Sequence, residues 1–218
     1  MPSPAPFEPE VDIVSDVVCP WCIIGYLQLQ KACAITGFRT KVRWHPFELN
    51  PKMPDEGQDM RAHLAEKYGT TTAQSRETRQ QLAALGADLG FAFNLADDSR
   101  MVNTFRAHQM IEWADEQGRQ NVMKQALFAA HFSQGRDVSS VETLADIAAE
   151  QGFDRGQALA VLGDARFAAT VRAMQNFWID RGIRGVPGMV FQKKHLLTGA
   201  QGVDTYVAML NRLAGEAA

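Results

Sequence analysis

The spacing of hydrophobic and polar residues changes along the chain and predicts its secondary structure. Residues 11–18 are mostly β-branched and apolar, as in a central buried strand. From Pro20 the apolar positions recur every three or four residues until Gly37, which predicts a helix with a glycine stop. Residues 41–45 then alternate strictly, which is the period of a half-buried strand. Strand, helix and strand in immediate succession predict a βαβ unit with parallel strands.

Helical spacing dominates the middle of the chain, and strand spacing returns near its end. Two apolar runs at 189–192 and 195–198 surround Lys193-Lys194 and predict a hairpin, and residues 203–213 form a last amphipathic helix. Between a proline-rich loop at 46–57 and this hairpin, the candidate helices are residues 59–68, 72–89, 101–117, 122–133, 141–150, 154–162 and 165–181.

The order of these elements predicts an α/β core interrupted by a large all-helical insertion. The core would be a discontinuous domain of residues 10–57 and 166–214, in the order βαβ and then ββα. Residues 58–165 would form the insertion domain. Residues 1–9 hold four of the 9 prolines and are expected to be a flexible N-terminus.

Composition and charge exclude several classes of protein. The chain has 218 residues, of which 46% are hydrophobic and 22% charged, so it can bury a large core and is not intrinsically disordered. No run approaches the roughly 18 apolar residues of a membrane-spanning helix, so no membrane partner is expected. The net charge of -3 and the lack of a basic stripe argue against nucleic acid. The N-terminus lacks a secretory signal pattern and 3 cysteines fit a reducing compartment, which predicts a cytoplasmic protein.

Residues 19–22, Cys-Pro-Trp-Cys, are the strongest chemical motif. A disulfide exchange catalyst needs an attacking thiolate and a second thiol that releases the mixed disulfide. The motif lies where the first strand gives way to the first helix, so Cys19 is expected at the helix N-terminus, where free N–H groups and the helix dipole stabilise a thiolate. Pro20 suits the first helical position because it lacks an N–H. Trp21 would cover one side of the pair, and Cys22 would be more buried and less reactive.

Other interpretations of the cysteines are weaker. A Cys-x-x-Cys pair can be half of a zinc site, but a second such pair is missing and the histidines show no metal spacing, so we predict no metal. Cys33 lies on the same helix face as Cys22 but about 16 Å further along the axis, which is too far for a disulfide. We expect Cys33 to be a small core residue.

A second motif lies at residues 185–191, Gly-Val-Pro-Gly-Met-Val-Phe. A proline between glycines, directly before a strand, favours a tight turn and a cis peptide bond at Pro187. Asp16, three residues before Cys19, is interpreted either as a proton relay or as a solvated or capping carboxylate. His108 is expected to be a hydrogen-bonded helix histidine rather than a ligand contact, and Asp97-Asp98 a turn with a helix cap.

Together the two motifs resemble the thioredoxin superfamily, in which a Cys-x-x-Cys follows the first core strand and a cis-proline loop packs against it. The helical insertion and the segments 44–51 (WHPFELNP) and 103–108 (NTFRAH) are similar to the FrnE-like branch of the DsbA family. The resemblance spans residues 10–214 and implies a thioredoxin fold and a thiol–disulfide oxidoreductase or isomerase. Thiols or disulfides of proteins or small molecules would be the partners, and either a monomer or a homodimer is compatible with it.

The resemblance also implies roles for individual residues. Cys19 would be the nucleophile, Cys22 the resolving thiol and Pro187 the cis-proline that closes one side of the site. Pro20, Trp21 and Val186 would contact the substrate, Val186 through its backbone N–H and C=O. No cofactor is implied beyond the Cys19–Cys22 disulfide, with glutathione a candidate co-substrate.

The chain departs from some relatives that share these motifs. Periplasmic DsbA proteins carry a histidine where Trp21 stands, and its absence argues against a strong oxidant. Kappa-class glutathione transferases and 2-hydroxychromene-2-carboxylate isomerases have serine in the position of Cys19, so both cysteines favour redox chemistry. A glutathione-dependent isomerase or transferase and a non-catalytic peptide-binding holdase are the alternatives.

Overall fold

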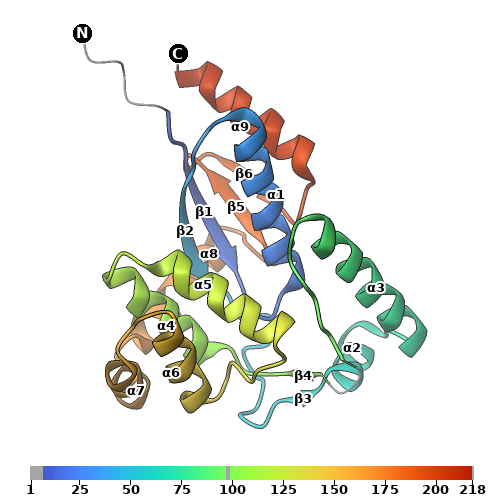
Figure 1. Cartoon of the computed structure of the whole chain (residues 1–218), viewed down its shortest axis with the longest axis vertical. Coiled ribbons are helices and arrows are strands. Elements are labelled where there is room, and N and C mark those ends of the chain that lie inside the picture. The colour runs from blue at the N-terminus through green and yellow to red at the C-terminus, as the bar shows by residue number, and fades with distance from the viewer. Residues whose placement is uncertain (1–6, 97–98, 218) are drawn as a thin grey trace.

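The computed structural model describes residues 7–96 and 99–217 and contains a central four-stranded sheet in the order β2-β1-β5-β6 (Figure 1). β1 pairs in parallel with β2 and antiparallel with β5, so Ile13 lies opposite Trp44 on one side and Met189 on the other. The strands of this sheet are β1 (Glu10–Ser15), β2 (Lys41–Pro46), β5 (Gly188–Phe191) and β6 (His195–Thr198).

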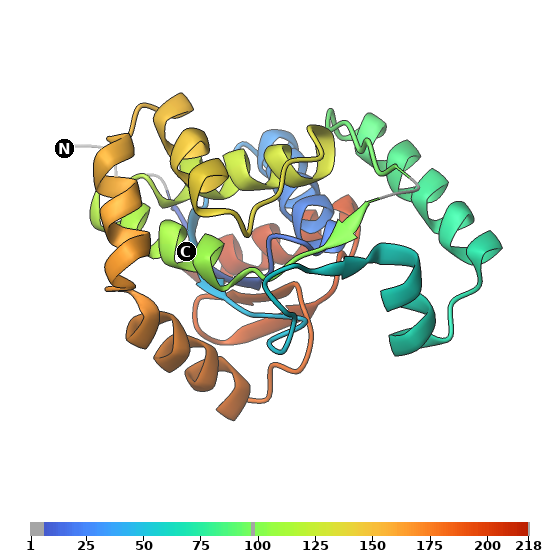
Figure 2. The ribbon, with the colours of Figure 1, turned by 90° about the horizontal axis from the view of Figure 1, so that it is seen from below.

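Helices cover both faces of the sheet at β1. On one face α1 (Pro20–Thr36) and α9 (Val203–Ala217) pack side by side, while α8 (Ala168–Asp180) lies across the sheet from α1 (Figure 2). Val14 faces the α8 side, where it contacts a buried Trp178. Because both faces are covered, the apolar residues of β1 are buried, as the sequence predicted for a central strand.

The remaining elements form a helical block between β2 and α8. In Figure 1, α4 to α7 gather at the lower left of the sheet, and α2 and α3 lie at the lower right. The elements are α2 (Met60–Tyr68), α3 (Thr72–Asp88), α4 (Phe105–Glu116), α5 (Gln120–Phe128), a π-helical turn (Ala129–Ser133), α6 (Val141–Glu150) and α7 (Arg155–Asp164). The predicted thioredoxin fold with a helical insertion is confirmed, with one addition: two short strands, β3 (Gln58–Asp59) and β4 (Arg100–Met101), pair in the inserted segment.

Several predicted boundaries are wrong, each for a local reason. The helix predicted at 101–117 begins only at Phe105, because Met101 pairs with β3 and the Asn103 side chain accepts a hydrogen bond from the Phe105 N–H. The helix predicted from Ala165 starts at Ala168, because Ala165 has a φ of 51° and ends α7. The predicted turn at Asp97-Asp98 and the prolines of residues 1–6 lie outside the described residues.

Only the first three residues of β2 follow the predicted half-buried pattern, because the last three residues are all buried. Trp44 and His45 are both buried although they point to opposite faces of the strand. The Trp44 ring is tilted against Tyr26 of α1 and packs edge-on against Phe128 of α5, with ring centres 5.1 and 5.9 Å away. His45 contacts Trp178 on the other face, with ring centres 4.8 Å apart. The sequence pattern did not predict this double burial because it contains no information on α5 and α8.

The outer edge of β2 is closed by a glutamine side chain. The amide of Gln120, at the start of α5, accepts a hydrogen bond from the Trp44 N–H at 2.8 Å and donates one to the Trp44 carbonyl at 3.0 Å. These are the bonds that a neighbouring strand would make, so the edge is protected from pairing with another chain. Asn121 adds a bond from the Trp44 indole at 2.9 Å. The start of α5 is therefore held in a defined position against the sheet.

Within the described part of the chain, no helix is long and apolar enough to cross a bilayer. The described start of the N-terminal segment contacts the core, because the Phe7 ring packs edge-on against Phe38 with ring centres 6.3 Å apart.

Replacing Gln120 with alanine tests the edge closure. The Gln120→Ala variant would leave the buried N–H and C=O of Trp44 without partners, which should lower the free energy of unfolding by about 2–3 kcal/mol. Urea unfolding followed by tryptophan fluorescence measures this loss. Gln81→Ala, at an exposed position of α3, is the matched control and should change stability by less than about 0.5 kcal/mol. Equal losses in the two variants would contradict the role of Gln120.

Candidate active site

The dithiol lies at the junction between the end of β1 and the start of α1. Cys19 is the N-cap residue of α1, with extended backbone angles of φ -95° and ψ 111°, and Pro20 occupies the first turn. The Cys22 N–H donates to the Cys19 carbonyl at 3.1 Å, which begins the helix. Cys19 thus lies at the positive end of the helix dipole, where negative charge on sulfur is stabilised.

The two thiols differ in accessibility. Cys19 is 4% exposed, whereas Cys22 is 0% exposed. Burial is the main cause that raises the pKa of Cys22 well above its ordinary value, and the neighbouring Cys19 adds to the shift. Both thiols are therefore buried, but Cys19 lines the cleft, whereas Cys22 is fully enclosed and is held as the neutral thiol at neutral pH.

The proline loop lies beside Cys19. The Val186–Pro187 peptide bond is cis, as the sequence predicted, and the Cys19 thiol donates a hydrogen bond of 3.6 Å to the Val186 carbonyl. α1 packs closely against this loop at Gly25. A Cβ at Gly25 would lie 3.0 Å from the end of Met189 and 3.5 Å from the Pro187 ring.

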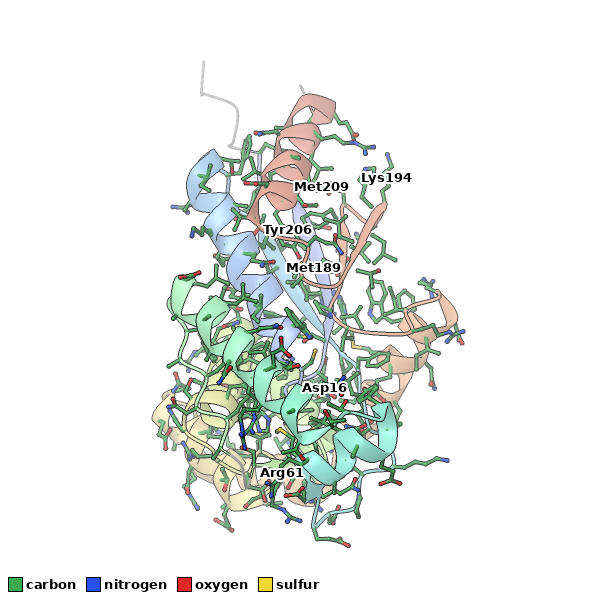
Figure 3. The ribbon with its side chains drawn as sticks, turned by 90° about the vertical axis from the view of Figure 1, so that its right-hand side faces the viewer. Asp16, Arg61, Met189, Lys194, Tyr206 and Met209 are labelled. Atoms are coloured by element: carbon green, nitrogen blue, oxygen red, sulfur yellow. The ribbon has the colours of Figure 1, made fainter. Side chains whose placement is uncertain are left out.

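Asp16 is a buried carboxylate directly after β1 (Figure 3). Its Oδ2 accepts a hydrogen bond from the Leu49 N–H at 2.7 Å, and its Oδ1 lies 3.4 Å from Nε2 of His108. Burial alone would raise the pKa of Asp16, but His108, the Leu49 N–H and Lys124 together hold it below its ordinary value, so the carboxylate is ionised. The interpretation as a solvated carboxylate is therefore wrong. The expected hydrogen-bonded histidine is found, since His108 Nε2 donates to the Phe47 carbonyl at 3.0 Å.

Lys124 is a fully buried cation that the sequence analysis missed. Its Nζ lies 5.2 Å from the centre of the Trp44 ring and 4.8 Å from that of Phe128. Burial lowers the pKa of Lys124 to about 8, whereas negative charge on Cys22, Asp16 or Cys19 acts in the opposite direction. A lysine within the apolar stripe of a predicted helix was the available sequence signal.

The loop that follows β2 is held next to the dithiol by a polar network. Asn50 Oδ1 accepts hydrogen bonds from Lys67 Nζ at 2.6 Å and from His63 Nε2 at 3.1 Å. Burial lowers the pKa of His63, and the charge of Lys67 lowers it further, which favours the neutral imidazole. The sequence did not single out Asn50 or His63 for this position, because the contacts join residues that are distant along the chain.

A cleft of about 350 Å³ opens beside Cys19, between the start of α1 and the helices α2 and α3. The structure places Pro20, Trp21 and Val186 on its wall. The lining of the cleft is mostly apolar and also includes Leu64, Leu82, Leu95 and Phe132. The described residues contain no group of three or more His, Cys, Asp or Glu side chains that could hold a metal ion. Cys33 is half-buried near Thr40, with Sγ and Oγ1 3.6 Å apart.

The sheet topology, the dithiol at a helix N-terminus and the cis-proline beside it define a thioredoxin-fold protein with an inserted helical block. Residues 10–211 match the DSBA-like thioredoxin domain, and the chain belongs to this family.

Solved structures agree with this assignment. A probable DsbA oxidoreductase, SCO1869 from Streptomyces coelicolor, is 30% identical with a TM-score of 0.88, and the match covers 96% of this chain and 91% of that one. A 2-hydroxychromene-2-carboxylate isomerase shares the fold at 15% identity and a TM-score of 0.74, over 95% and 97% of the two chains. The cytosolic disulfide reductase DsbM from Pseudomonas aeruginosa, solved with GSH, shares the fold at 22% identity and a TM-score of 0.64, and the match covers 94% of this chain and 98% of that one.

Alkylation tests the difference between the two thiols. In the reduced protein at neutral pH, iodoacetamide should modify Cys19 at least about ten-fold faster than Cys22, because Cys22 is buried and protonated. Peptide mass spectrometry after timed quenching measures both rates. Protein unfolded in urea is the control, in which the two rates should become comparable. Similar rates in the folded protein would contradict the asymmetry.

Proposed function

We propose that this protein is a cytoplasmic thiol–disulfide oxidoreductase or isomerase of the FrnE-like branch, which acts through the Cys19–Cys22 dithiol. One observation carries the proposal. Cys19 is at the N-terminus of α1, on the wall of a cleft and 3.6 Å from the carbonyl that precedes a cis-proline. Such a thiol is stabilised as a nucleophile and lies where a substrate sulfur can reach it.

In the reducing direction, the Cys19 thiolate attacks one sulfur of a substrate disulfide. A Cys19–substrate disulfide forms, and the second substrate sulfur leaves as a thiolate and takes up a proton. The Cys22 thiolate then attacks Cys19 Sγ, which releases the remaining substrate sulfur and forms the Cys19–Cys22 disulfide. Two electrons pass from the dithiol to the substrate. The reverse sequence oxidises a substrate dithiol, and the reduction potential decides between the two directions.

The cleft supports a thiol-containing peptide as substrate. Its volume of about 350 Å³ is in the range of small-molecule sites. Val186 offers backbone N–H and C=O groups to an extended peptide, and Trp21 and Pro20 would cover the reacting sulfurs. Glutathione is such a peptide, and DsbM, which shares the fold, was solved with GSH. We therefore propose glutathione as a co-substrate, with no cofactor beyond the active-site disulfide.

A glutathione-dependent isomerase is the second candidate, because a 2-hydroxychromene-2-carboxylate isomerase has the same fold. Isomerisation of an aromatic substrate does not require a resolving thiol. Isomerase activity that survives in the Cys19→Ser and Cys22→Ser variants would favour this candidate over the redox function.

Trapping of substrates tests the proposed function. The Cys22→Ala variant should accumulate covalent mixed disulfides at Cys19, because the resolving thiol is absent. Non-reducing electrophoresis and mass spectrometry of the purified variant detect them. The Cys19→Ala/Cys22→Ala variant is the matched control and should trap nothing. If Cys22→Ala traps no more than this control and the wild type lacks glutathione-exchange activity, the proposed function is wrong.

A further inference from the structure

The loop of residues 47–50, which follows β2, supplies part of the lining of the cleft. Leu49 and Asn50 line the cleft together with Cys19 and Val186. None of the residues 47–50 belongs to a helix or strand, so contacts with neighbouring elements fix their position. The placement of this loop therefore affects what a substrate meets beside the reacting sulfur.

Glu48 is the charged residue of this loop, and it is buried. Its side chain is 3% exposed, and its Oε2 accepts a hydrogen bond from Arg172 and another, of 3.0 Å, from Gln175 Nε2. Both partners belong to α8, where they lie three residues apart on one face, and Arg172 also donates to Gln175 Oε1 at 3.0 Å. The Arg172 guanidinium lies over the Phe105 ring of α4, 3.9 Å from its centre. α8 thus supplies the cation and the amide that a buried carboxylate requires.

Val186, at the cis-proline loop, is held by the same helix. Phe47 and Val186 both pack against a small apolar cluster that includes Trp178 of α8 and Val14 of β1. α8 is also joined to Val186 along the chain, since only residues 181–185 separate them. One helix therefore positions two of the segments that line the cleft.

An uncompensated charge on Glu48 would displace the loop. A carboxylate without a cationic partner is unstable in a protein interior and gains free energy by reaching water. Glu48 is enclosed, so it reaches water only if the backbone of residues 47–50 shifts. The adjacent Leu49 and Asn50 would then leave their places on the cleft. Removal of both charges together leaves no such uncompensated carboxylate, and this distinguishes the role of the ion pair from a general contribution to stability.

We propose that Glu48 and Arg172 form a positioning pair that sets the substrate selectivity of the cleft, by holding Leu49 and Asn50 where a peptide disulfide bound at Cys19 contacts them. This inference rests on the proposed function and extends it to the choice of substrate. A small disulfide has fewer atoms with which to contact the loop. Glu48 and Arg172 are not among the residues that line the cleft, so the reactivity of Cys19 towards a small disulfide should not depend on them.

Two disulfides of different size separate selectivity from reactivity. Reduced protein is mixed with glutathione disulfide or with 2-hydroxyethyl disulfide. In each reaction the dithiol passes two electrons and two protons to the added disulfide, which yields the Cys19–Cys22 disulfide and two small thiols. Acid quenching, alkylation in denaturant and mass spectrometry of the intact protein give the second-order rate constants. The rate constant for glutathione disulfide divided by that for 2-hydroxyethyl disulfide measures the selectivity.

Arg172→Met removes the cation and keeps a long side chain. We expect the selectivity ratio to fall about ten-fold, a loss typical of a misplaced binding contact, while the rate with 2-hydroxyethyl disulfide stays within about two-fold of wild type. Glu48→Gln/Arg172→Met should recover most of the lost ratio, because an amide carries no charge that needs a partner. Arg172→Lys keeps the charge without the planar guanidinium, so its ratio should lie between those of the wild type and Arg172→Met.

Arg212→Met is the matched control, because it removes an exposed arginine of α9 that is paired with Glu216, and it should leave the ratio unchanged. An unchanged ratio in Arg172→Met would overturn the inference, as would equal slowing with both disulfides or a double variant as impaired as Arg172→Met. If Arg172→Met does not fold, Arg172→Lys decides in its place, and a wild-type ratio in that variant overturns the inference. Failure of the wild type to react with either disulfide would instead refute the proposed function.

Discussion

The close approach of α1 to the cis-proline loop is the constraint on which the rest of the site depends. At Gly25 the packing leaves little spare room, because a Cβ there would be in ordinary contact with the Pro187 ring and would press on the flexible end of Met189. With the helix in this position, its N-terminus brings Cys19 into hydrogen-bonding distance of the Val186 carbonyl. The same packing removes Cys22 from solvent. The start of α1 thus supplies one thiol on the lining of the cleft and one that is fully enclosed.

The helical block does more than cover the sheet. Through Gln120 it supplies the hydrogen bonds that the free edge of β2 lacks, and through α2 and α3 it forms one wall of the cleft. Closing over the end of β1 also buries Asp16, which holds the loop after β2 through the Leu49 N–H. Edge protection, the cleft beside Cys19 and the buried charges of Asp16 and Lys124 therefore all depend on how the inserted helices pack against the core.

The sequence was sufficient to predict the site where the chemistry is local. Residues 19–22 contain both thiols and the proline that begins the helix, so their arrangement follows from adjacent residues. The cis bond at Pro187 was likewise predicted from its glycine neighbours. Element order was predictable because hydrophobic spacing differs between helices and strands. The boundaries failed where a tertiary contact ended the element, as at Met101, which pairs with a strand 43 residues earlier.

The amino-acid sequence by itself determined the class of fold, the identity of the dithiol and its position at the start of a helix, because these depend on local spacing and backbone preferences. Only the tertiary structure decided that Asp16 is buried and ionised rather than solvated, and that Lys124 is buried against Trp44 and Phe128 rather than in water. Burial and electrostatic interaction depend on which distant segments meet. A sequence pattern does not state which distant segments come into contact, so the buried charges near the site are identified only from the three-dimensional structure.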